Sequence, residues 1–130
     1  MELQELIQGI ERAFVARASY DEIVRLIDEA AAHPQPGDLV ALPAYWRHTI
    51  AMEYDRPSSE CREALVAFLA LEPDMERCLW ACAAAWSMHP DLADIFEREA
   101  GFIAAMPPCR LRDAAMTTVA EIRARGLRQH

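Results

Sequence analysis

The chain has 130 residues, of which 53% are hydrophobic and 26% charged, a balance that excludes a disordered chain and suits one domain over residues 1–130. Its formal net charge is −8, with 13 basic residues, all of them arginine, against 21 acidic residues. Residues 1–106 carry 8 Arg and 19 acidic residues (net −11), whereas residues 107–130 carry 5 Arg and 2 acidic residues (net +3). An acidic body argues against nucleic acid as the main partner, because phosphate contacts require clustered cations.

The sequence shows no sign of export or of membrane insertion. The N-terminal stretch "MELQELIQGIE" is acidic and amphipathic, unlike a signal or transit peptide. The longest apolar runs, "CLWACAAAW" and "ALVAFLAL", are much shorter than the roughly 20 residues of a membrane span. The four cysteines are therefore expected to be reduced thiols in the cytoplasm, and the use of arginine without lysine is typical of a GC-rich, bacterial coding sequence.

The pattern along the chain predicts helices throughout, because no stretch alternates with the period of a strand. Apolar side chains recur at helical spacing in residues 3–14. Ser19 followed by Glu22 fits a capping box at the start of a second helix. The segment "HPQPGD" breaks the helical pattern, and a third helix is expected from Asp38 to about Tyr54.

Proline-containing breaks also delimit the later helices. Connections of two to six residues imply that successive helices are antiparallel neighbours, so the fold class we expect is all-α, a compact bundle of six to seven short antiparallel helices. The remaining expected helices run from a cap at Ser58 or Ser59 to Leu71, over about 74–88, from Pro90 to near Met106, and from about Cys109 to Arg125.

Two parts of the chain echo each other. "DLVAL" at 38–42 and "DLADI" at 91–95 each begin an expected helix, and each precedes a proline and then a second helix, "REALVAFL" at 62–69 and "RDAAMTTV" at 112–119. This pattern loosely resembles HEAT-like α-helical repeat proteins. The resemblance implies a short array of stacked αα-hairpins as the alternative to a plain bundle.

The densest group of reactive side chains lies in "MERCLWACAAAWSMHP", residues 75–90. On a helical wheel Cys78, Cys82 and His89 share one side, and such a set could ligate a soft metal such as Zn²⁺ or Cu⁺. A structural zinc site needs four ligands, usually from two segments, and no second closely spaced pair exists. We therefore expect these cysteines to be small buried hydrophobes and expect no cofactor.

Trp80 lies on the opposite side of the same helix. Because this helix is apolar nearly all round, we expect it to be central and Trp80 to pack under a neighbouring helix. If Trp80 is instead exposed, it would make an interface anchor beside Glu72, Asp74 and Glu76.

A second group of candidate binding residues is the stretch "AYWRHT". Helical spacing turns Trp46 one way and Arg47 and His48 another, which predicts a half-buried surface helix. The same side chains could instead line a ligand pocket or a partner surface.

Two further cysteines, Cys61 and Cys109, fall in the first turn of expected helices. The helix dipole can lower the pKa of a thiol at that place. Packing without reactivity is the ordinary role of such residues, and it is the one expected here.

The function that we expect is binding rather than catalysis. The size, acidity and lack of a catalytic motif suit a small inhibitor or immunity-type protein that binds another protein with a basic surface, such as a toxin, nuclease or defence complex. One alternative is a helical enzyme or ligand- or metal-binding domain with a pocket near His48, Cys78, Cys82 and His89. Another is a self-associating scaffold, for which a homodimer is the simplest form.

Overall fold

The computed structural model describes residues 2–34 and 36–125, and every regular element in this part of the chain is a helix. The predicted all-α fold class is thereby confirmed. Two short 3-10 helices, η1 (Gly37–Leu39) and η2 (Pro90–Leu92), precede longer ones. The α-helices are α1 (Leu3–Val15), α2 (Tyr20–Ala31), α3 (Leu42–Glu53), α4 (Ser58–Leu71), α5 (Met75–Met88), α6 (Ala93–Ala104) and α7 (Arg110–Ala124).

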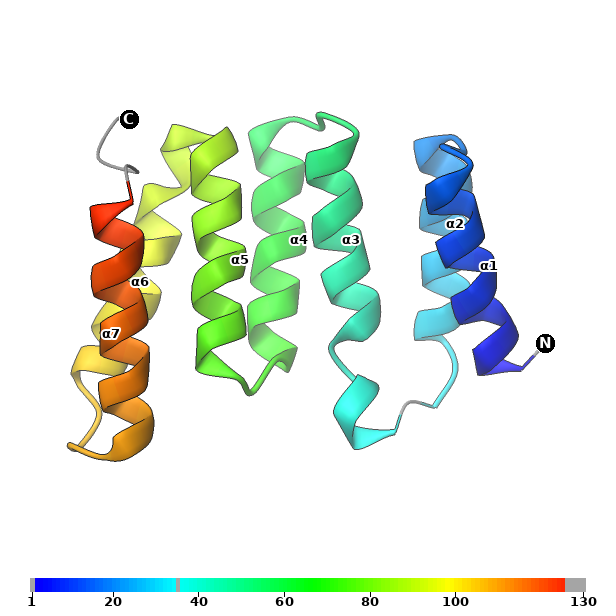
Figure 1. The fold of residues 1–130 in the computed structure, drawn as a ribbon. Coiled ribbons are helices and arrows are strands. Elements are labelled where there is room, and N and C mark those ends of the chain that lie inside the picture. The colour runs from blue at the N-terminus through cyan, green and yellow to red at the C-terminus, as the bar shows by residue number, and fades with distance from the viewer. Residues whose placement is uncertain (1, 35, 126–130) are drawn as a thin grey trace.

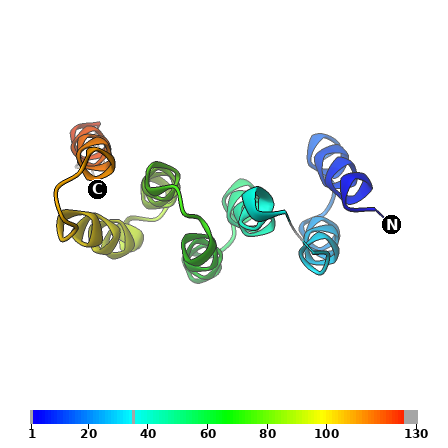
Figure 2. The ribbon, with the colours of Figure 1, turned by 90° about the horizontal axis from the view of Figure 1, so that it is seen from below.

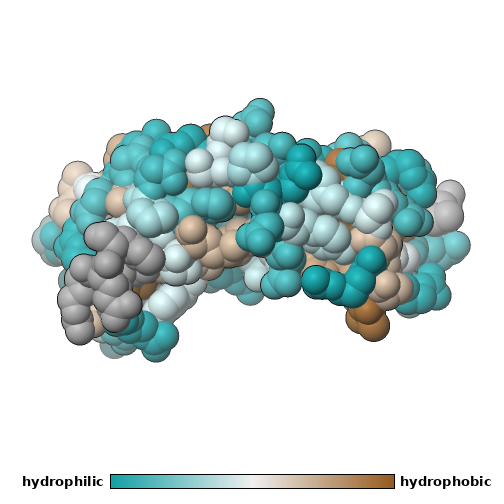
Figure 3. All heavy atoms as spheres, turned by 90° about the horizontal axis from the view of Figure 1, so that it is seen from above, coloured by the Kyte–Doolittle hydropathy of each residue, from teal (hydrophilic) through white to brown (hydrophobic). Residues whose placement is uncertain are grey.

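The helices form a two-row array in which neighbours in sequence are antiparallel neighbours in space (Figure 1). Viewed along the helices, α1, α3, α5 and α7 form one row, and α2, α4 and α6 form the other (Figure 2). The first row curves inward at α3, so its outer surface is concave. The space-filling view from the opposite end shows the same hollow along one long side of the molecule (Figure 3).

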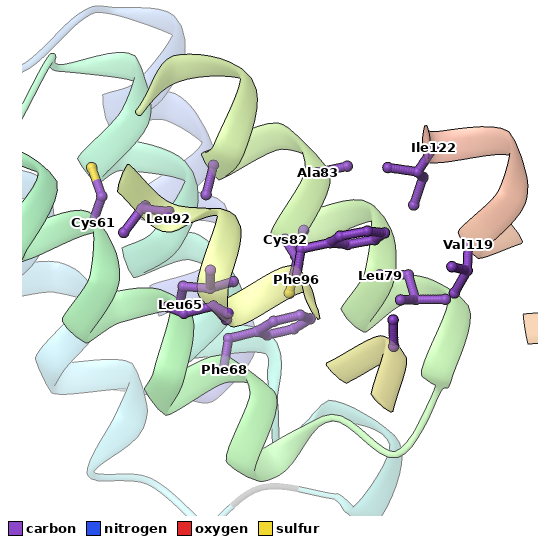
Figure 4. Close-up of a cluster of buried hydrophobic side chains, with 14 of the residues drawn as sticks. Cys61, Leu65, Phe68, Leu79, Cys82, Ala83, Leu92, Phe96, Val119 and Ile122 are labelled. Atoms are coloured by element: carbon purple, nitrogen blue, oxygen red, sulfur yellow. The ribbon is translucent and has the colours of Figure 1, made fainter. Parts of the chain in front are cut away.

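The larger of two buried clusters is built around α5, which packs against α4, α6 and α7. In Figure 4, Leu65 and Phe68 of α4, Leu79 and Cys82 of α5, and Phe96 of α6 lie in this cluster. Six residues of α5 are buried, on several sides of the helix. The expectation that this segment is central is therefore confirmed.

A smaller buried cluster holds the first hairpin against α3. Its members are Leu6 and Ile10 of α1, Ile23, Ile27 and Ala30 of α2, and Ile50 of α3. Besides this apolar contact, the Tyr54 hydroxyl donates a 2.6 Å hydrogen bond to the backbone carbonyl of Ala18. Helix α3 therefore contributes to both clusters, with Ala51 on the side of the larger one.

The helix starts follow local capping chemistry. As predicted, Ser19 is the N-cap of α2, and its hydroxyl accepts a hydrogen bond from the Glu22 N–H at 3.2 Å. Asp74 caps α5 in the same way, accepting from two N–H groups. The predicted Ser58 or Ser59 cap is wrong. Pro57 is the N-cap of α4, because its φ of −56° and ψ of 153° set the extended entry that a first turn requires.

Two predicted helix starts are also wrong. The third helix begins at Leu42 rather than Asp38, since an earlier start would place Pro43 in a helix interior, where its ring would clash. The sixth begins at Ala93 rather than Pro90. The tight η2 turn comes first and places Leu92, which is fully buried, in the larger cluster.

The internal echo of the sequence corresponds to real local similarity but not to a repeating unit. Each "DL" segment forms a 3-10 turn, η1 or η2, that leads into a helix. The helices that follow, α3 and α6, are an odd number of positions apart, so they lie in opposite rows (Figure 2). In a HEAT-like array, equivalent helices would lie in the same row.

No helix in the described ranges 2–34 and 36–125 has the length and apolar character needed to cross a membrane.

Two helices end on a residue in the left-handed conformation that favours glycine: Arg17 after α1 (φ 57°) and Asp55 after α3 (φ 54°). The Asp55 carboxylate makes no ion pair within the described residues, so the side chain offers little to offset this backbone conformation.

We expect Asp55→Gly to raise the free energy of unfolding by up to about 1 kcal/mol, because glycine adopts this φ without the steric cost of a Cβ. Urea denaturation measures the change. Asp55→Ala, which keeps the Cβ, is the control and should show no gain. A glycine variant no more stable than the alanine variant would contradict this account of the helix end.

Candidate functional site

The candidate site is a groove on the concave side, between α3 and α5, with α4 as its floor; we call it the α3–α5 groove. It has a volume of about 500 Å³, in the range of pockets that bind small organic groups. Its small residues are Ala41, Ala81 and Ala84. The other lining residues are Leu39, Leu42, Tyr45, His48, Thr49 and Met52 from the α3 side, Phe68 from α4, Glu72 directly after it, and Arg77 and Trp80 from α5.

The groove is elongated. Its α3 wall extends from Leu42 to Met52, which at about 1.5 Å per residue is a length of roughly 15 Å. Its α5 wall extends from Arg77 to Ala84. The two walls are parallel, because each is antiparallel to α4 between them (Figure 1). Both helices therefore begin at the same end of the groove.

His48 is the buried polar side chain of this groove, with 2% of its surface exposed. The imidazole stacks on Phe68 of α4, with ring centroids 6.3 Å apart and planes 13° apart. Its Nδ1 atom is buried and has no hydrogen-bond partner among the described residues. The prediction of a half-buried surface helix is wrong for His48, because α3 packs against α2 on one side and α4 on the other.

Burial lowers the pKa of His48 from its ordinary 6.5 to about 4, because the low-dielectric surroundings disfavour the imidazolium ion. His48 is therefore neutral at physiological pH. A neutral imidazole has one nitrogen that donates and one that accepts.

This burial predicts a pH dependence of stability. Because the folded pKa lies below the unfolded one, the unfolded state binds more protons between pH 6.5 and 4, and stability falls as the pH falls through that range. His48 alone should lower the free energy of unfolding by about 2 kcal/mol between pH 7 and pH 5. Urea titrations at both pH values, compared with His48→Gln, isolate this contribution. An equal pH dependence in the variant would contradict it.

Charged side chains gather at the end of the groove where α5 begins. Glu72, whose side chain is only 8% exposed, lies 3.4 Å from the Arg77 guanidinium, and Asp74 lies 3.8 Å from it. Asp74 also caps α5, so part of its role is structural. Glu76 is exposed and forms no ion pair within residues 2–34 and 36–125. Arg77 thus pairs with two carboxylates, and Glu76 adds a third negative charge in the first turn of α5.

Aromatic rings line the middle of the groove. Tyr45 is 46% exposed, and its ring centroid lies 5.5 Å from that of Phe68. Trp80 is partly buried, and the guanidinium of Arg125 lies 5.0 Å from its ring centroid. Trp80 therefore packs against the larger cluster and Arg125, the C-cap of α7, as predicted for a residue under a neighbouring helix, and it also lines the groove.

Three of the seven predicted partner-binding residues, His48, Glu72 and Trp80, meet in the α3–α5 groove. Trp46 and Arg47 do not. Trp46 packs against the smaller buried cluster, and Arg47 pairs with Asp28 of α2 at 2.8 Å. Both hold the first hairpin in place.

The three candidate metal ligands do not converge. The buried Cys78 donates to the Glu72 carbonyl at 3.5 Å, and Cys82 lies inside the larger cluster. The His89 side chain instead contacts α4, where its Nε2 lies 3.5 Å from the Cys61 sulfur. Within the described residues, no three His, Cys, Asp or Glu side chains are grouped to hold a metal ion.

The thiols differ sharply in accessibility. Burial raises the pKa of Cys78 and of Cys82 to about 12, and burial together with nearby carboxylates raises the pKa of Cys61. The helix start at Cys61 thus does not produce a reactive thiolate, because desolvation outweighs the helix dipole. Cys109 is exposed, and its sulfur accepts a hydrogen bond from the Arg112 N–H at 3.4 Å.

Titration with a thiol reagent at pH 8 should therefore show one rapidly reacting thiol in the native protein and four after denaturation. Cys109→Ser should remove the rapid phase without changing stability appreciably. Rapid reaction of a second thiol would show that the cluster around α5 opens more readily than its packing indicates.

The stretch "AYWRHT" had pointed to Tyr45 as a possible pocket residue, but the sequence did not point to Met52, Phe68 or Ala84 as members of a site. Each is an ordinary apolar residue at helical spacing, and only the arrangement of α3, α4 and α5 brings them together. The clearest signal available was that the segment "LPAYWRHTIAME" has apolar residues on all sides, which is typical of a helix packed between neighbours.

Comparisons of the chain with models of known protein families, with curated proteins and with solved structures find no match.

Proposed function

We propose that this protein is a binding module whose concave side, centred on the α3–α5 groove, binds a protein partner with a basic surface. The observation that carries the proposal is the groove itself, where the exposed Tyr45 and the partly buried Trp80 lie near carboxylates that are only partly neutralised. Interfaces typically combine a desolvated aromatic anchor with a polar rim.

The shape of the molecule supports this choice of surface. Stacked helical arrays commonly bind their partners on the concave side, because curvature lets many helices contact one ligand. Here the concave row contains α3 and α5, which supply the walls of the groove (Figure 2).

The net negative charge of the chain supports a partner with a basic surface. The chain has a formal charge of −8, and Glu76 stands exposed at the charged end of the groove. Opposite charge on a partner would speed association and orient it, with a strong dependence on ionic strength.

Within this class, we favour a cytoplasmic bacterial inhibitor or immunity-type protein that covers a basic toxin, nuclease or defence complex. This choice among protein-binding modules rests on the small size and acidity of the chain and on analogy with small acidic inhibitors.

The test is capture from a lysate of the source organism, with the wild type and four variants each immobilised. A specific partner should be retained by the wild type, released as salt rises, and lost with Glu76→Arg. The matched control is Glu22→Arg, which reverses an exposed glutamate in the first turn of α2, in the other row, and should retain the partner.

A second pair of variants tests the groove. Ala84→Phe fills it and should abolish capture, whereas Ala67→Phe places the same side chain at an exposed position of α4 and should not. Capture that is insensitive to salt, or equal losses in each pair, would contradict the proposed surface.

A further inference from the structure

The α3–α5 groove contains a hydrogen-bonding side chain that its own chain leaves unused. His48 is almost wholly buried, and its Nδ1 has no partner in the described part of the chain. Buried polar groups are nearly always paired, and an unpaired one carries a full desolvation cost. A ligand group that pairs with this nitrogen would recover that cost on binding.

We propose that the groove binds a tyrosine side chain of the partner, with its hydroxyl hydrogen-bonded to His48 and its ring held among the aromatic groups of α3, α4 and α5. This inference rests on the proposed function and adds to it the chemistry that the groove selects.

The lining favours an aromatic ring. Tyr45, Phe68 and Trp80 surround the middle of the groove, and the thioether of Met52 adds a polarisable contact. The alanines Ala81 and Ala84 leave the space that a ring needs. With about 500 Å³ available, the groove holds a tyrosine ring together with an adjacent residue of the same segment.

The electrostatics favour a neutral ring with a hydroxyl. Glu72 is already paired with Arg77, and His48 is neutral at physiological pH, so a buried ligand charge would have no counter-ion in the middle of the groove. A hydroxyl both donates and accepts, so it satisfies either tautomer of the imidazole, whereas an indole N–H only donates. Because Nδ1 itself is covered, the proposed contact requires the imidazole to turn about its Cβ–Cγ bond.

The charged end of the groove sets the neighbours of this tyrosine. Glu72 and Asp74 pair there with Arg77, and Glu76 in the first turn of α5 is exposed and has no ion pair among the described residues. A basic residue next to the tyrosine in the partner would therefore lie at the end where α5 begins.

The test uses two probes that differ only in the hydroxyl, N-acetyl-tyrosinamide and N-acetyl-phenylalaninamide. Binding is followed by NMR through the Trp80 indole N–H. The tyrosine amide should bind the wild type about fivefold more tightly, the effect of one hydrogen bond. Equal affinities on the wild type would overturn the inference, and this comparison requires no variant.

Variants test whether His48 causes the preference for the tyrosine amide over the phenylalanine amide. His48→Leu should reduce the ratio to about one, and Ala84→Phe should block both probes, whereas Ala67→Phe should change neither. A preference that persists in His48→Leu would overturn the role of His48.

The outcomes separate this inference from the proposed function. If the probes bind equally but the capture experiment shows its expected pattern, the binding module stands and the tyrosine inference is overturned. If the wild type prefers the tyrosine amide but no partner is captured, the hydroxyl contact with His48 is supported. The proposal that a partner protein supplies the tyrosine is then overturned.

Discussion

Helix α5 buries six of its fourteen residues, and the larger cluster forms because those residues contact α4, α6 and α7 together. A helix so apolar can exist in water only when neighbours cover several of its sides. This requirement sets the zigzag of the second half of the chain, with α4 and α6 in one row and α5 and α7 in the other (Figure 2). The strip of α5 that remains on the concave side, with Trp80 and Ala84, becomes one wall of the groove.

The groove follows from this arrangement rather than from any sequence motif. Because α4 separates α3 from α5, the two walls are a fixed distance apart, and small side chains at Ala81 and Ala84 leave the space between them unfilled. His48 and Phe68 form its floor as a stacked pair. The site thus borders the larger buried cluster and contains a buried nitrogen with no hydrogen-bond partner among the described residues, which is a good basis for selective binding.

The number and approximate extent of the helices were predictable, because proline breaks and the Ser19 cap act locally. The starts of α3 and α6 were not, since the 3-10 turns before them depend on tertiary packing. Leu92 of η2 is fully buried in the larger cluster, whereas Leu39 of η1 lines the groove. His48 was misplaced for a related reason. A helical wheel ranks the sides of one helix, but α3 is covered on two sides, and only the neighbours decide which sides are buried. Glu72 and Trp80 were identified by their type and neighbourhood, and their meeting with His48 required the three-dimensional arrangement.

The interior is divided into two buried clusters, and the boundary between them lies at α3. The first hairpin is held to α3 by the Ile50 contact, the Tyr54–Ala18 hydrogen bond and the Arg47–Asp28 ion pair, while the rest of the array is tied together by α5. Such a boundary separates units that open with different free energies. Amide protons of α1 and α2 should accordingly exchange with solvent sooner than those of α5. A movement of this hairpin about α3 would change the width of the concave surface and therefore the size of the partner that it can contact.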